Sequence, residues 1–130
     1  MVLRVIDATQ AKPGTTILVD GYPYTVRSND ISKTGKHGAS KCRIEAVGVF
    51  VDKKKIIAVP GGERFDVPNI EKRRVQILSV GHNTASVMDL ESYETIDVPY
   101  HESIKDEMVP EKNAEMWIVE EKKMIMRVLS

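Results

Sequence analysis

Two glycines bracket a lysine–histidine pair at positions 35–38, and the candidate chemistry of the chain is concentrated there. Gly35 and Gly38 let the backbone turn sharply without shielding its tip, so the amine of Lys36 projects into solvent. Four further cations lie within the same 17 residues, opposed only by Asp30: Arg27, Lys33, Lys41 and Arg43. Such a loop predicts contact with phosphate groups through charge, without base recognition. A hairpin tip made basic for solubility is the alternative interpretation.

The remaining reactive side chains form no catalytic or metal-binding pattern. The three histidines lie far apart in the sequence and Cys42 is the only thiol, so no metal-ligand spacing is present. Gly35-Lys36 superficially matches a phosphate-binding loop, but Asp30 stands where the first glycine belongs and His37 replaces the Ser or Thr after the lysine. No nucleophile–base pair or paired-carboxylate motif is present. The sequence therefore predicts no enzyme activity, no metal and no small-molecule substrate.

Composition indicates a globular protein of a reducing compartment. Apolar residues make up 42% of the chain and charged residues 29%, which excludes wholesale disorder. No apolar run approaches the roughly 20 residues that cross a bilayer, and the first residues do not form a signal peptide. A single cysteine permits no internal disulfide. We therefore expect a cytoplasmic location and no contact with a membrane.

The net charge of zero conceals two halves of opposite sign. Residues 1–68 hold 11 Lys and Arg against 7 Asp and Glu, whereas residues 69–130 hold 8 against 12. This asymmetry indicates two surfaces with different partners, and only the first half suits phosphate. Chance segregation of charge on two solvated surfaces remains the alternative.

Alternating apolar residues, with turn residues every eight to twelve positions, predict an all-β protein. Asp20-Gly21 supplies the positive φ angles of a two-residue hairpin turn. The basic stretch 32–40 is expected to be a loop. The strands expected in the first half cover residues 15–19, 22–27, 41–51, 56–59 and 64–67.

The strand pattern breaks at residues 68–72, where the charge balance also changes sign, so we expect two domains, 1–69 and 70–130. In the second half, a helical turn within 101–108 separates the third and fourth strands, which is typical of an OB-type barrel. Trp117 lies in the fourth, apolar strand and is expected in the core. The strands expected there cover residues 74–80, 85–90, 94–98, 115–120 and 124–129.

The loop resembles the hypusination loop of the eukaryotic and archaeal translation factor 5A family. The matching residues are Ser32-Lys33, Thr34-Gly35-Lys36-His37-Gly38 and Lys41. Gly38 is followed by Ala39 and Ser40, where the eukaryotic pattern continues with histidine and alanine, so the resemblance is to archaeal-type members. It extends through Asp20-Gly21, Val47-Gly48-Val49-Phe50, Val67-Pro68, Arg73-Arg74, Met88-Asp89-Leu90 and Tyr93-Glu94-Thr95.

The resemblance implies an N-terminal SH3-like barrel followed by a C-terminal OB-fold, without the third domain of the bacterial counterpart, elongation factor P. It also implies that deoxyhypusine synthase transfers an aminobutyl group from spermidine to Lys36, which gives deoxyhypusine or hypusine. No other cofactor is implied. The residues that would support the modified lysine and contact that enzyme are Lys33, Thr34, Gly35, His37 and Gly38.

The partners that the resemblance implies are the ribosome, its ribosomal RNA and the peptidyl-tRNA. There the modified arm would promote peptide-bond formation at stalling sequences such as proline runs. The residues expected to contact RNA backbone are Arg27, Lys33, Lys41 and Arg43.

A generic single-stranded RNA-binding module or RNA chaperone of the OB type is the alternative function. Such modules need exposed aromatic side chains on a basic groove. The second half offers Tyr93, Tyr100 and Trp117, but its charge balance is negative and Trp117 is expected to be buried. These observations favour the translation factor over the alternative.

Overall fold

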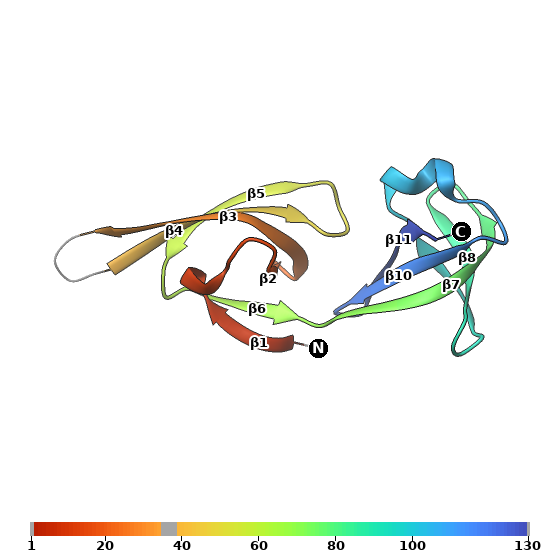
Figure 1. The fold of residues 1–130 in the computed structure, drawn as a ribbon, viewed down its shortest axis with the longest axis horizontal. Coiled ribbons are helices and arrows are strands. Elements are labelled where there is room, and N and C mark those ends of the chain that lie inside the picture. Colours follow the sequence, from red (N-terminus) through yellow and green to blue (C-terminus); the bar gives the residue numbers. More distant parts are fainter. Residues whose placement is uncertain (1, 35–38, 130) are drawn as a thin grey trace. The chain divides into compact units, whose positions relative to one another are not determined.

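The structure is a computed structural model of the 130-residue chain, and it describes residues 2–34 and 39–129. The chain forms two compact units, Met1–Asn69 and Ile70–Ser130 (Figure 1). Strands dominate both units and the helices are short 3-10 turns, so the predicted all-β class is confirmed. In the described part of the chain, no helix has the length and apolar character needed to span a membrane.

The described residues of the N-terminal unit form one four-stranded antiparallel sheet, ordered β2-β3-β4-β5, and a second sheet that pairs β1 with β6. The 3-10 helix η1 (Ala8–Gln10) follows β1. β1 is absent from the predicted strands because most of its side chains are exposed and show no buried–exposed alternation. The strands are β1 (Val2–Asp7), β2 (Thr16–Val19), β3 (Tyr22–Thr34), β4 (Ala39–Gly48), β5 (Lys54–Pro60) and β6 (Arg64–Pro68).

The turn between β2 and β3 has the predicted geometry. Asp20 and Gly21 have φ angles of 55° and 82°, and the flanking residues Val19 and Tyr22 are directly paired. Two positive φ angles give the turn a twist that matches that of the flanking strands. The hairpin brings apolar side chains of both strands into the core of this unit, whose members include Ile17, Tyr24, Val26, Ile44 and Ala46.

β3 and β4 differ from the predicted strands. β3 continues seven residues past its expected end at Arg27, while β4 begins at Ala39 instead of Lys41 and ends at Gly48 instead of Val51. A β-bulge between Val26 and Ser28 interrupts the alternation that the sequence pattern depends on. Beyond the bulge, cross-strand pairing maintains a strand whose residues are mostly polar.

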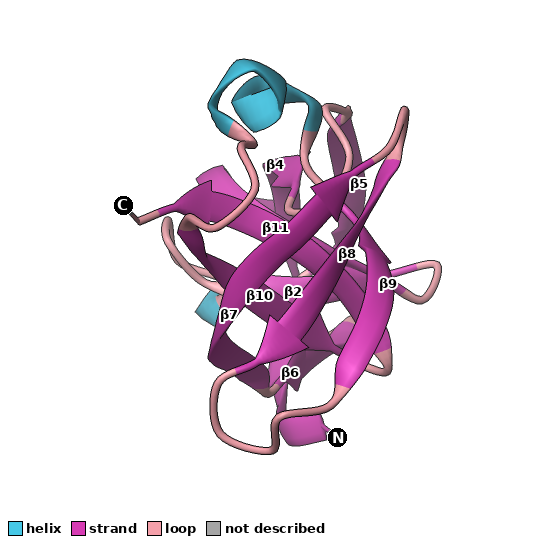
Figure 2. Ribbon diagram, turned by 90° about the vertical axis from the view of Figure 1, so that its right-hand side faces the viewer, coloured by secondary structure: helices cyan, strands magenta, loops and turns pink. Residues whose placement is uncertain are grey.

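The C-terminal unit contains five strands in its described residues, with a short helix between the third and fourth. The sheet order is β11-β10-β7-β8-β9 (Figure 2), and a parallel bridge between Tyr100 and Ile125 joins its two ends. This closure and the helix position match the predicted OB-type barrel. The elements are β7 (Ile70–Val80), β8 (Thr84–Asp89), β9 (Thr95–Pro99), η2 (Glu102–Glu107), β10 (Asn113–Val119) and β11 (Lys122–Val128).

The prediction that Trp117 lies in the core is wrong. Ala114 and Met116 on β10 are fully buried inside the barrel, and Trp117 points to the opposite face, where it is only partly buried. The run Met116-Trp117-Ile118-Val119 is apolar throughout, so the sequence alone gives no sign of which residues face inward. The inward-facing residues pack in a core that includes Val75, Ile77, Val87 and Ile125.

Candidate functional site

The hairpin of β3 and β4 forms an arm, here defined as residues 28–34 and 39–45. Its antiparallel pairing continues to the pair Thr34–Ala39, well past the last pair between β2 and β3 at Thr16–Thr25 (Figure 1). Residues 35–38 follow Thr34 in the sequence and lie outside the described residues, as does the side chain of Thr34. The predicted site residues Gly35, Lys36, His37 and Gly38 therefore stay a prediction, and the described arm is the frame that positions them.

Asn29 ties the arm to the barrel from one side. Its side-chain amide donates hydrogen bonds to the backbone oxygens of Ala8 and Ala11, at 2.8 and 3.1 Å. Both acceptors are fully buried residues in or next to η1, so the arm is fixed against a packed part of the unit.

Gly61 ties the arm from the β5–β6 loop. Its backbone N–H donates to the oxygen of Ser40 at 2.9 Å. A Cβ atom at this position would lie 1.9 Å from Ser40 Oγ and 2.9 Å from Thr9 Cγ2. Glycine is therefore the residue that permits this close approach between the loop and the arm.

The four predicted RNA-contacting cations do not share one face of the arm. Lys41 is paired with Ser32, and Arg43 is paired with Asp30. Because paired residues share a face and alternate residues repeat it, Lys41 and Arg43 lie together on one face. Lys33 is paired with Ser40, which is the pair next to Ser32–Lys41. Adjacent pairs point to opposite faces, so Lys33 lies on the other face of the arm. All three of these cations are exposed.

Arg27 lies apart from the other cations. It is the additional residue in the bulge between Val26 and Ser28, and its side chain is exposed. The structure thus brings Lys41 and Arg43 together and separates them from Lys33 and Arg27. The prediction that all four residues contact RNA backbone is neither supported nor excluded by this arrangement, and it stays a prediction.

The electrostatics of this unit distinguish structural lysines from the cations of the arm. Lys55 binds Asp20 at 2.8 Å and Lys54 binds Glu45, and in each case the lysine is the main cause of the lowered pKa of its partner carboxyl. Lys41 and Arg43 make no ion pair with any described residue. Their charges are therefore available to an anion from outside the chain. Burial raises the pKa of the neighbouring Cys42 thiol and keeps it in the neutral form.

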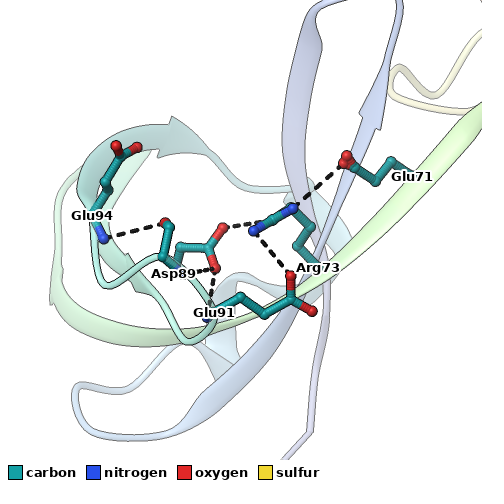
Figure 3. A network of polar contacts seen from close by, with 6 residues as sticks. Glu71, Arg73, Asp89, Glu91 and Glu94 are labelled. Carbon is teal, nitrogen blue, oxygen red and sulfur yellow. Dashed lines mark hydrogen bonds and ion pairs between the residues drawn. The ribbon is translucent and has the colours of Figure 1, made fainter.

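Arg73 organises a second polar cluster, in the C-terminal unit (Figure 3). Its Nε donates to Asp89 Oδ2 at 2.6 Å, and its Nη2 lies 3.1 Å from Glu91 Oε2. The other oxygen of Asp89 accepts from the backbone N–H groups of Glu91 and Ser92, at 2.8 and 3.2 Å. The hydrogen bond from Arg73 is the main cause that lowers the pKa of Asp89 to about 2.

This cluster serves to hold the β8–β9 loop. Every charge of the Arg73–Asp89 pair is already compensated within the unit, which leaves no group poised for acid–base chemistry. A cavity of about 250 Å³ beside the pair is lined by polar side chains together with Ile96, Met116 and Ile118. Across residues 2–34 and 39–129, no three His, Cys, Asp or Glu side chains are grouped to hold a metal ion.

Sequence reasoning missed the residues that hold the arm: Asn29, Ser40 and Gly61. Asn29 and Ser40 carry no motif, and their partners lie about twenty residues away in the chain, so no local pattern marks them. Gly61 was detectable only as part of a Pro-Gly-Gly turn. Its contact with Ser40 depends on how the sheets fold together.

The sequence and the fold both match known proteins. Residues 4–62 match the family model described as "Translation initiation factor 5A-like, N-terminal". The protein named "Translation initiation factor 5A" from Thermococcus onnurineus is 42% identical over 103 residues, which are 79% of this chain and 76% of that protein. The protein of the same name from Pyrobaculum aerophilum is 38% identical over 131 residues, which are 98% of this chain and 95% of that protein.

Solved structures agree with this assignment. The "Eukaryotic translation initiation factor 5A from Methanococcus jannaschii" superposes with a TM-score of 0.83 at 30% identity, covering 97% of this chain and 94% of that one. The "Translation initiation factor eif-5a family protein" from Naegleria fowleri shares the fold, with a TM-score of 0.77 at 22% identity. The predicted class of two small barrels, SH3-like and then OB-fold, is thereby confirmed, and so is the resemblance to the factor 5A family. The chain belongs to the translation initiation factor 5A family.

Proposed function

We propose that this translation factor acts on the cytoplasmic ribosome beside the peptidyl-tRNA, where a modified Lys36 at the end of the arm promotes peptide-bond formation at stalling sequences such as proline runs. The modification is the aminobutyl group of deoxyhypusine or hypusine, transferred from spermidine by deoxyhypusine synthase. The protein makes and breaks no bond of the peptide itself. It positions RNA electrostatically at the site of the reaction.

One observation carries the proposal: a fixed arm with outward-facing cations leads directly to the loop that contains Lys36. From Asn29 to Thr34 the arm spans roughly 17 Å, at about 3.4 Å per strand residue. Asn29 anchors its base, while β5 and Gly61 hold β4 as far as Lys41 and Ser40, so little of that length is lost to bending. An anchored arm delivers a cation at a defined distance from the barrel, which a flexible basic tail does not.

We propose different tasks for the cations of the arm, according to the faces on which they lie. Lys41 and Arg43, which share a face and form no ion pair with a described residue, make the backbone contacts that orient the arm on RNA. Lys33 lies on the opposite face and, with Thr34 and the loop residues, is assigned to the contact with the modifying enzyme. Arg27 contributes at the base of the arm. The aminobutyl group adds reach and a second positive charge to Lys36.

The deciding experiment compares Lys36→Arg with Lys36→Ala in translation of a proline-run reporter, with the protein supplied together with its modifying enzyme and spermidine. Arginine keeps one positive charge but cannot accept the aminobutyl group, so both variants are expected to lose the stimulation of the reporter. Lys12→Arg is the matched control, because it makes the same change on an exposed lysine outside the arm.

Two outcomes contradict the proposal. Full stimulation by the Lys36→Arg protein means that an ordinary cation suffices and that the modification is unnecessary. The proposal also fails if peptide mass mapping finds the aminobutyl group on Lys33 or Lys41 and finds Lys36 unmodified.

A further inference from the structure

Three strands of the C-terminal unit carry a basic face that the net charge of the unit conceals. Trp117 on β10 is directly paired with Lys72 on β7 and with Met124 on β11. Glu115, two residues earlier on the same face of β10, is paired with Arg74 and with Arg127. Directly paired residues share a face of the sheet, so these six side chains lie together on the outside of the barrel. We call them the tryptophan face.

The indole ring at the centre of the tryptophan face is held in a defined orientation. The Lys72 ammonium lies 4.5 Å from the centroid of the Trp117 ring, within the range of a cation–π contact. The indole N–H donates to Glu115 Oε1 at 2.8 Å. The acceptor therefore fixes the edge of the ring, and the ammonium of the exposed Lys72 covers its face. A planar ligand can displace that ammonium at small cost, because water can solvate it.

The charges of the tryptophan face favour an anionic partner. Lys72, Arg74 and Arg127 are exposed, and none of them forms an ion pair with a described residue. Glu115 is the one acid among the six, and its Oε1 accepts the indole N–H, so three cations surround a single carboxylate. The face is thus locally positive, although residues 69–130 as a whole hold 8 cations and 12 anions.

We propose that the tryptophan face binds single-stranded RNA, with a base stacked on Trp117 and phosphates paired with Lys72, Arg74 and Arg127. An aromatic ring among cations that follow a groove or strand is the combination that single-stranded nucleic acid requires. An acidic protein fits less well, because stable protein interfaces bury about 800 Å² on each side around an apolar core. The tryptophan face offers only Trp117 and Met124 for such a core.

This inference goes beyond the proposed function, because it concerns another surface and does not require Lys36. The two proposals fail separately. Loss of RNA binding at the tryptophan face leaves the reporter contrast between the Lys36 variants intact. Equal activity of those variants says nothing about stacking on Trp117.

Trp117 is the only tryptophan of the chain, so its fluorescence reports on this face directly. The full-length protein is titrated with a fluorescein-labelled 12-nucleotide oligouridylate, and quenching of the indole and anisotropy of the label are both recorded. We expect quenching that saturates together with the anisotropy change. The binding constant should fall with salt by about 0.7 log units per log unit for each phosphate contacted.

The variants separate the ring from the charges. The combined Lys72→Ala, Arg74→Ala and Arg127→Ala protein is expected to bind at least tenfold more weakly, with a salt slope reduced by about 2. Trp117→Ala should weaken binding about tenfold through lost stacking, and Trp117→Phe should recover part of it while preserving the packing of the strand. The single Lys72→Ala protein removes one of these charges, and Lys105→Ala, which removes an equal charge from η2, should change nothing.

Three results overturn the proposal. RNA that binds without quenching Trp117 contacts the chain elsewhere, for instance on the arm. A Lys105→Ala protein as weak as the single Lys72→Ala protein shows a response to net charge alone. Quenching of equal size by polyglutamate assigns the face to an acidic protein partner in place of RNA.

Discussion

Lys41 and Arg43 on the arm and Arg73 in the C-terminal unit are all cations on β-strands, but their surroundings differ. The two arm residues are exposed, and no described carboxylate is within ion-pair distance of them. Arg73 is three-quarters buried and binds Asp89, whose side chain is only 9% exposed. The two arm cations thus face solvent, whereas the Arg73–Asp89 ion pair is largely enclosed by the fold.

The difference shows that burial decides whether a charge serves stability or recognition. Solvent already satisfies an exposed cation, so its removal costs the fold little, and its energy is available for a partner. A buried ion pair offers little to a partner, but removal of one member leaves the other uncompensated. Substitutions in the two regions should therefore separate stability from function.

The largest expected effect is on stability, from Asp89→Ala. Removing this carboxylate leaves the charge of Arg73 without its buried partner, and two backbone N–H groups of the β8–β9 loop lose their acceptor. The free energy of unfolding should therefore fall by about 3 kcal/mol. Urea denaturation measures the change. Glu91→Ala is the control, because Glu91 also contacts Arg73 but is 74% exposed, and it should cost under about 0.5 kcal/mol. Equal losses from both variants would mean that burial of the pair is irrelevant.

The next effect is a loss of stability in acid. The pKa of Asp89 is lowered from 3.8 to about 2, so its ionised form stabilises the folded state. That stabilisation is complete above about pH 4, and it is lost as the pH falls through 2, by about 2 kcal/mol in total. Unfolding free energies measured from pH 5 to pH 2 test this slope. The Asp89→Ala protein should lack that component, and an unchanged slope in the variant would assign the acid sensitivity to other groups.

The smallest effect on stability is expected from the arm. Lys41→Ala and Arg43→Ala should each change the free energy of unfolding by under about 0.5 kcal/mol, because both side chains are exposed. The same variants should lower the affinity for ribosomes gradually, with a weaker dependence on salt. Pelleting of the protein with ribosomes at several salt concentrations gives both quantities. A loss of stability comparable to that of Asp89→Ala would remove the distinction between the two regions.

Features encoded by neighbouring residues were predictable from the sequence. The turn at Asp20-Gly21 was predicted correctly because two adjacent residues supply both of its positive φ angles. The helical insert before β10 was predicted correctly because Ile104 and Met108 mark one face of a short turn, and both are buried.

Features that depend on distant contacts were not predictable. The length of β3 depends on pairing of polar residues with β4, and the anchors at Asn29 and Gly61 depend on atoms of η1 and of Ser40. The outward orientation of Trp117 depends on the register of three strands, which an unbroken apolar run does not encode. Lys36 itself lies outside the described residues, so its role still rests on the sequence of the loop.

The buried Cys42 makes the protein a convenient subject for distance measurements by fluorescence. It is the only cysteine in the chain, and burial both shields its sulfur and raises its pKa. Maleimide dyes react with the thiolate form, so they should leave the native residue untouched at neutral pH. A cysteine introduced at the exposed Ser32 would then take up dye selectively. With Trp117 as the sole indole donor, energy transfer would measure the separation between the labelled arm and the C-terminal unit without replacement of Cys42.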